Sequence, residues 1–150
     1  MKEEKCFALL IAGVLVSALT VFQIIVSFSP EWSLYFGAPE EITTNPSQLL
    51  VVGFVAAVFF FVFALYAFSG QGVIRRLPFL RIALVAIAAI FVLRGCVLFL
   101  LLAARFGIVD TPVTNFPVEL TSAIISLIIG FFYSMGTYRF WEKLNSANAK

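Results

Sequence analysis

One arginine stands inside a long apolar run. Arg94 is the only charged residue between Ala89 and Ala103. An arginine near the centre of a membrane helix costs about 2.5 to 3.5 kcal/mol on insertion scales, so such residues usually face a partner or water. The guanidinium group has a fixed fork of N–H donors that matches a carboxylate or a phosphate. The chemistry that Arg94 offers is therefore the binding of an anionic group.

Further polar residues that could complete such a site lie near the ends of the neighbouring apolar segments. At 1.5 Å per residue, Arg94 lies about 18 Å from the start of its own segment, and therefore in the half farther from that start. The candidate ligand-binding residues are Arg94, Gln23, Glu31, Glu119 and Ser122. Two alternatives stay open: Arg94 can extend to the outer surface or be neutralised by one carboxylate, and it can contact another subunit.

The composition places these residues in a membrane. Of the 150 residues, 62% are hydrophobic and 12% are charged, compared with roughly 25% charged residues in a soluble domain. Four segments have the length of about 20 apolar residues that a membrane span needs, namely 6–28, 49–68, 82–104 and 120–138. They are continuously apolar, which favours helices over barrel strands. The sequence predicts an all-α, membrane-embedded antiparallel four-helix bundle that forms a single domain over residues 1–150.

Basic residues are sorted to one side of these segments. One side holds Lys2, Lys5, Arg75, Arg76, Arg81, Arg139, Lys143 and Lys150, and the other holds Arg105 with Glu31, Glu40, Glu41, Asp110 and Glu119. Loops rich in lysine and arginine stay in the cytoplasm, so both termini are predicted to be cytoplasmic. Arg75, Arg76, Arg81 and Arg139 are candidates for contact with lipid head groups, or they only fix the topology.

Several chemistries have no residues to support them. The sequence contains two cysteines and no histidine, which makes a haem, copper or catalytic zinc site improbable. Cys6 and Cys96 are expected at different depths and too far apart to form a disulfide. General acid–base catalysis needs positioned titratable groups, and no pair of acids is spaced to share one helix face deep in the membrane. We therefore expect no catalytic residues, no metal, no cofactor and no nucleic-acid partner; an enzyme acting on a lipid or quinone is the least favoured possibility.

Small residues indicate how the helices pack. Ser122, Ser126, Gly130 and Ser134 follow one another at intervals of four residues, which is typical of closely packed membrane helices.

In the third segment, the small residues and Arg94 lie on opposite faces, so only one of the two faces can point into the bundle. Ala89, Cys96 and Ala103 repeat every seven residues, nearly opposite Arg94. Either these three pack within the bundle and the arginine faces outward, or the arginine faces inward and they meet another subunit.

The connection between the first two segments, residues 29–48, is rich in aromatic residues. Trp32, Tyr35 and Phe36 suit a membrane interface, where they would form an anchoring belt. The alternative is a lid over a pocket that faces outward.

One part of the chain resembles a known group. Residues 66–81 follow the pattern Y-A-x-S-G-x-G-x-I-R-R-L-P-x-L-R, with Tyr35-Phe36-Gly37 before it and Leu93-Arg94-Gly95 after it. This pattern resembles one found in small uncharacterised four-span membrane proteins of bacteria. The resemblance covers about the middle half of the chain. It implies the four-span architecture and a bacterial inner-membrane location, and it implies no functional residues.

The sequence leaves two main hypotheses for function. The first is a non-enzymatic membrane module, either an accessory subunit of a larger membrane complex or a homo-oligomer within the lipid bilayer. The alternative is a transporter or binder of an anionic or amphipathic, lipid-like ligand in the outer half of the bundle around Arg94.

Overall fold

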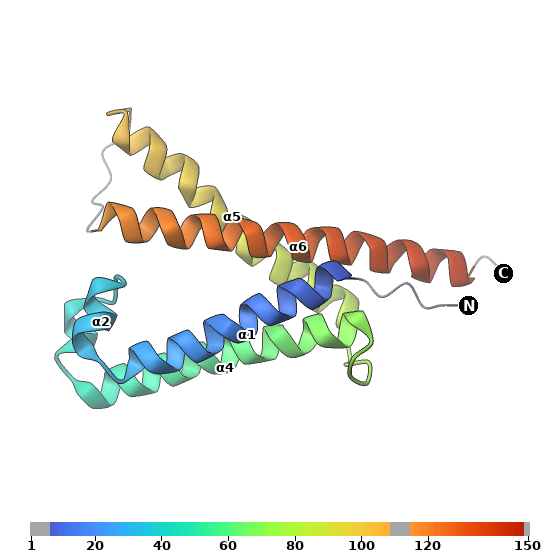
Figure 1. The fold of residues 1–150 in the computed structure, drawn as a ribbon, viewed down its shortest axis with the longest axis horizontal. Coiled ribbons are helices and arrows are strands. Elements are labelled where there is room, and N and C mark those ends of the chain that lie inside the picture. Colours follow the sequence, from blue (N-terminus) through green and yellow to red (C-terminus); the bar gives the residue numbers. More distant parts are fainter. Residues whose placement is uncertain (1–6, 109–114, 149–150) are drawn as a thin grey trace.

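The chain forms a bundle of helices. The computed structural model describes residues 7–108 and 115–148, with side chains as far as Trp141, so that Lys2, Lys5, Cys6, Asp110 and Lys150 and the Lys143 side chain lie outside the described part. The helices are α1 (Phe7–Ser27), α2 (Pro30–Tyr35), α3 (Glu40–Thr43), α4 (Pro46–Gln71), α5 (Leu80–Arg105) and α6 (Phe116–Asn148) (Figure 1). The described residues contain no strand. The predicted all-α fold with four packed apolar helices is confirmed.

Four helices are long and apolar enough to cross a membrane, namely α1, α4, α5 and the part of α6 from Phe116 to Trp141. Large apolar side chains cover their outward faces, as expected for helices surrounded by lipid. The chain is therefore an integral membrane protein. Helices α4 and α6 begin three and four residues, respectively, before the predicted apolar segments, because polar residues and prolines form their first turns.

Local hydrogen bonds fix the ends of α4. The Asn45 side chain accepts a hydrogen bond from the Ser47 amide at 3.2 Å, which caps the first turn. At the other end, the Ser69 hydroxyl donates to the Arg75 carbonyl at 3.1 Å and accepts from the Leu77 amide at 2.9 Å. The turn that joins α4 to α5 is thereby held in one conformation.

The four long helices form two hairpins. Helix α1 packs along α4, and α5 packs along α6. Glycines allow the close approach in the second hairpin: a Cβ atom at Gly95 would lie 2.5 Å from Leu127 Cγ, and one at Gly130 would lie 2.9 Å from Val92 Cγ2. Such contacts between glycine and a bulky neighbour are typical of membrane helices, which gain stability from van der Waals packing.

The two hairpins meet near the start of α1. A Cβ atom at Gly136 of α6 would lie 2.5 Å from Leu9 Cγ of α1, so these helices are in close contact there. Tyr133 is fully buried, its hydroxyl donates to the Phe63 carbonyl at 2.8 Å, and its ring stacks on Phe91. This end, called the basic end below, carries Arg75, Arg76, Arg81 and Arg139. Toward the other end, which carries α2, the hairpins diverge (Figure 1).

Candidate functional site

The divergence of the hairpins encloses a cavity at the α2 end. Its volume is about 680 Å³, within the range of about 300 to 1,000 Å³ that is usual for small-molecule sites. Residues from α1, α2, α4, α5 and α6 line it. Most of the lining is apolar, including Leu19, Phe22, Phe60, Phe63, Phe91 and Ile125.

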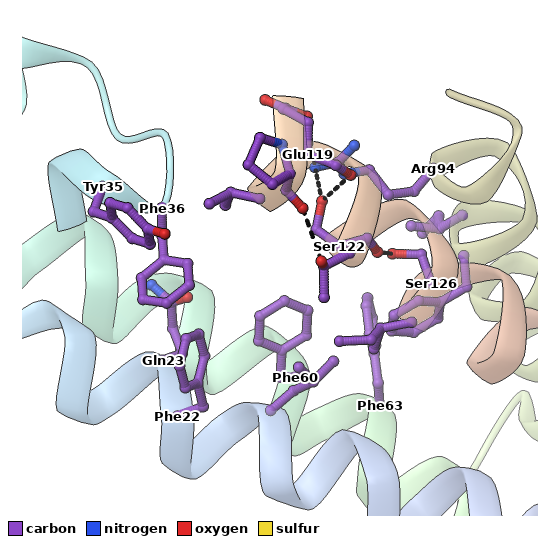
Figure 2. A pocket seen from close by; sticks show the side chains of 17 residues that line it. Phe22, Gln23, Tyr35, Phe36, Phe60, Phe63, Arg94, Glu119, Ser122 and Ser126 are labelled. Atoms are coloured by element: carbon purple, nitrogen blue, oxygen red, sulfur yellow. Dashed lines mark hydrogen bonds and ion pairs between the residues drawn. The ribbon is translucent and has the colours of Figure 1, made fainter. Parts of the chain in front are cut away.

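A polar group lies on one side of this cavity. Arg94 Nη2 donates a hydrogen bond to Ser122 Oγ at 3.1 Å, and the same atom lies 3.7 Å from Glu119 Oε2. The side chains of Arg94 and Glu119 are 46% and 37% exposed, respectively. Figure 2 shows the three residues together, with Gln23 across the cavity from them. The site therefore presents a half-exposed cation and carboxylate beside a largely apolar space.

Helix α6 orients Ser122 through its own backbone. The Ser122 hydroxyl donates to the Glu119 carbonyl at 2.9 Å, and the Ser126 hydroxyl donates to the Ser122 carbonyl at 2.8 Å. Because its proton is directed back to the helix, the Ser122 oxygen presents a lone pair to Arg94. The arginine is thus held at the edge of the cavity by a neutral acceptor.

The segment after α1 covers part of the cavity. Tyr35 and Phe36 line it, and the Phe36 ring meets Phe22 edge to face with centroids 5.0 Å apart. The Asn115 side chain donates to the Tyr35 carbonyl at 3.2 Å, which links this segment to the start of α6. Trp32, by contrast, is exposed and does not line the cavity. Of the aromatic residues predicted to form a belt or a lid, two therefore face the cavity.

Helix α2 is also tied to α1. The Ser33 side chain is buried, and its hydroxyl donates to the Val26 carbonyl at 2.8 Å. This carbonyl lies in the last turn of α1 and also accepts a hydrogen bond from the Ser29 amide at 3.1 Å. The serine bond therefore joins α2 to the end of α1.

The structure brings together four of the five residues proposed from the sequence as ligand-binding: Gln23, Arg94, Glu119 and Ser122 all line the cavity. Glu31 does not line it; this residue lies in the first turn of α2 and is exposed. Apart from Tyr35 and Phe36, the aromatic residues of the lining were not predicted from the sequence. The signal was present in α1, where Leu19, Phe22 and Gln23 have the spacing of a single helix face.

The structure also distinguishes the two arrangements of α5 that the sequence left open. Arg94 faces the cavity, whereas Ala89 and Cys96 are exposed and Ala103 is half-buried. Gly95, beside the arginine, makes the close approach to α6 in place of these small residues.

The predicted packing stripe of α6 is divided between several surroundings. Gly130 is buried against Val92, Ser122 and Ser126 are half-buried beside the cavity, and Ser134 is exposed on the outer side. Gly130 contacts α5 by close packing and Ser122 by its hydrogen bond to Arg94, so the stripe does not form one continuous packing seam.

The four arginines proposed to contact lipid head groups, Arg75, Arg76, Arg81 and Arg139, are exposed at the basic end, far from the cavity. The Arg81 guanidinium carbon lies 5.5 Å from the centroid of the Trp141 ring, a cation–π contact. Tryptophan at this position suits the membrane interface.

The described residues include no group of three or more histidine, cysteine, aspartate or glutamate side chains that could hold a metal ion.

Comparison with known proteins found no match: the chain matches no family model, no curated protein and no solved structure.

Proposed function

We propose that this protein binds an amphipathic, lipid-like ligand with an anionic group in its head, in the cavity between the two hairpins. The observation that carries the proposal is the position of Arg94, which is half-exposed at the edge of a cavity of about 680 Å³ whose lining is otherwise mostly apolar. An anionic head group beside the guanidinium and an acyl chain among the phenylalanines would match both parts of this lining.

The contacts of Arg94 support a role beyond structure. Its hydrogen bond to Ser122 is to a neutral group, and its distance of 3.7 Å from Glu119 exceeds the roughly 2.7 to 2.9 Å of a direct charge-assisted hydrogen bond. An open, half-exposed pair of this kind is worth only about 0 to 1 kcal/mol, less than the insertion cost of about 2.5 to 3.5 kcal/mol. Further hydrogen bonds, from water or a ligand, would offset the remainder.

The proposal extends to location and chemistry. The distribution of charged residues between the two ends of the bundle supports an orientation with both termini in the cytoplasm. Among the described residues, four arginines lie at the basic end and glutamates predominate at the α2 end. The cavity would then open in the outer half of a bacterial inner membrane. Within the described part of the chain, Glu119 is the only acid that lines the cavity, which supports binding or transport in place of catalysis.

The test compares two arginines of the same helix. Arg94→Ala removes the cation at the cavity, and Arg105→Ala removes an exposed cation that does not line it. Binding of a single-chain lipid with a phosphate head would be measured by native mass spectrometry of the purified protein. We expect Arg94→Ala to weaken binding by about tenfold to a hundredfold, since a hydrogen bond to a charged group is worth about 1.5 to 3 kcal/mol. Arg105→Ala should bind like the wild type.

Equal affinity of the Arg94→Ala variant and the wild type would refute the proposal. Circular dichroism of both variants gives the control for folding. The proposal would also be refuted if the wild-type protein bound no phosphate-bearing amphiphile.

Self-association, alone or within a larger complex, is a second candidate. The observation in its favour is that Ala89 and Cys96 lie exposed on α5, and that Ala89 lines a groove of about 420 Å³ together with Ser134 and Thr137 of α6. Small residues on an outward face permit close contact with another helix. Oxidative crosslinking through Cys96, in a variant without Cys6, should give a covalent dimer if this face meets a second copy. A chain that stays monomeric would argue against it.

A further inference from the structure

The charged residues at the cavity narrow the class of ligand. We infer that the head group of the ligand is zwitterionic: Arg94 binds its phosphate and Glu119 binds its ammonium group. This inference rests on the proposed function, because it concerns the same cavity and the same ligand.

The first observation is that Arg94 and Glu119 do not form a direct hydrogen-bonded ion pair. Arg94 Nη2 and Glu119 Oε2 are 3.7 Å apart, and among the described residues the hydrogen-bond acceptor of the guanidinium is Ser122. A guanidinium group has five N–H donors. Most of these donors, and the carboxylate itself, are therefore available to a ligand that enters the cavity.

The second observation is the balance of charge. Among the residues that the structure describes, Arg94 and Glu119 are the two charged ones in the lining. An anion bound to the guanidinium would lie close to the carboxylate, which would repel it. A head group that carries both charges attracts both side chains, and each side chain then has a partner of opposite sign. A zwitterion consequently fits the lining better than an anion alone.

The third observation concerns the space beside Glu119. Gly37 lies next to the carboxylate, where a Cβ atom would be 3.8 Å from Oε1. The Glu119 side chain is 37% exposed and lines the cavity, and Gly37 adds no side chain to the space beside its carboxylate. An ammonium group in the cavity can therefore approach the carboxylate, while the acyl chain extends toward Phe60 and Phe63.

The experiment uses single-chain lipids with the same acyl chain and three head groups: phosphate, phosphoethanolamine and phosphocholine. Their affinities for the full-length protein would be measured by native mass spectrometry, with Glu119→Gln as the test variant and Glu31→Gln as the matched control. We expect the wild type and Glu31→Gln to bind the phosphoethanolamine lipid about tenfold more tightly than the phosphate lipid. The phosphocholine lipid, whose ammonium group has no N–H donor, should fall between them. In Glu119→Gln this preference should disappear, and binding of the phosphate lipid should be retained or strengthened.

The outcomes separate the two proposals. If all three lipids bind in an Arg94-dependent way without a preference for the ammonium group, or if Glu119→Gln keeps that preference, the zwitterionic ligand is refuted and the proposed function stands. If no lipid binds, or if Arg94→Ala leaves the binding of all of them unchanged, the proposed function is refuted.

Discussion

Replacing Tyr133 separates the contribution of a buried hydroxyl from that of the ring that carries it. The side chain is fully buried, and its hydroxyl donates to the Phe63 carbonyl at 2.8 Å. In Tyr133→Phe the carbonyl keeps its helical partner within α4. Side-chain hydrogen bonds between membrane helices average about 0.6 kcal/mol and reach about 1.7 kcal/mol. We therefore expect Tyr133→Phe to lower the free energy of unfolding by about 0.6 kcal/mol.

Tyr133→Ala should cost much more, because it also removes the ring that stacks on Phe91 with centroids 5.9 Å apart. Truncating a buried aromatic residue costs about 3 to 5 kcal/mol in soluble proteins, part of which is the cavity left behind. In a membrane protein the unfolded side chain rests in lipid instead of water, so we expect a loss near the lower end, about 3 kcal/mol.

Unfolding in mixed micelles of increasing SDS content, followed by circular dichroism, measures both changes. Ser134→Ala is the control, because Ser134 is the next residue and is exposed. If Tyr133→Phe lost as much stability as Tyr133→Ala, the hydroxyl would dominate and the packing argument would be wrong. If Tyr133→Ala behaved like the control, the hairpins would not be joined at this residue.

Three further predictions follow from single contacts. Gly95→Val should lower the free energy of unfolding by about 1 to 3 kcal/mol, as measured in the same micelles, because a Cβ atom would lie 3.0 Å from Leu127 Cα; a stability equal to that of the wild type would contradict the observed helix contact. Ser33→Ala removes the bond to the Val26 carbonyl, so amide exchange in residues 30–36 should accelerate while global stability falls by no more than about 1.5 kcal/mol; unchanged exchange would mean that this bond does not hold α2. Cys96 is a free, exposed thiol, and a lipid-soluble maleimide should label it in the folded protein; protection from labelling would instead support its burial against a second copy.

Much of the fold could be predicted because membrane spans depend on composition and length. Apolar runs of about 20 residues identify the four long helices without knowledge of any partner. The short helix α2 was not predicted, although its signal was present: Ser29 caps it, Pro30 opens it and Glu31 lies in its first turn. Aromatic residues dominate the segment and favour an interpretation as interface anchors, which conceals this helix signal.

The site was harder to predict because it depends on the distance between hairpins. Helical spacing indicates that residues share a face, but it does not give the separation of that face from the helices opposite. The orientation of α5 stayed open for a related reason. Its residues are apolar on nearly all sides. The sequence therefore does not decide whether Arg94 or the stripe of Ala89 and Cys96 faces the interior of the bundle. In the structure, Gly95 makes the close contact with Leu127, and the adjacent arginine bonds to Ser122 of α6.

Close packing at the basic end and the cavity at the α2 end have a common cause. At the basic end, Gly136 admits Leu9, and Ala64 and Ala67 occupy the core, so the hairpins can approach. Toward the α2 end, the side chains of Phe22, Phe60 and Phe63 line the space between the hairpins. Straight helices that converge at one end must diverge at the other, and Arg94 lies where they have diverged. The arginine therefore does not need a sealed ion pair, because the widening bundle gives it a space in which water or a charged head group can satisfy its donors.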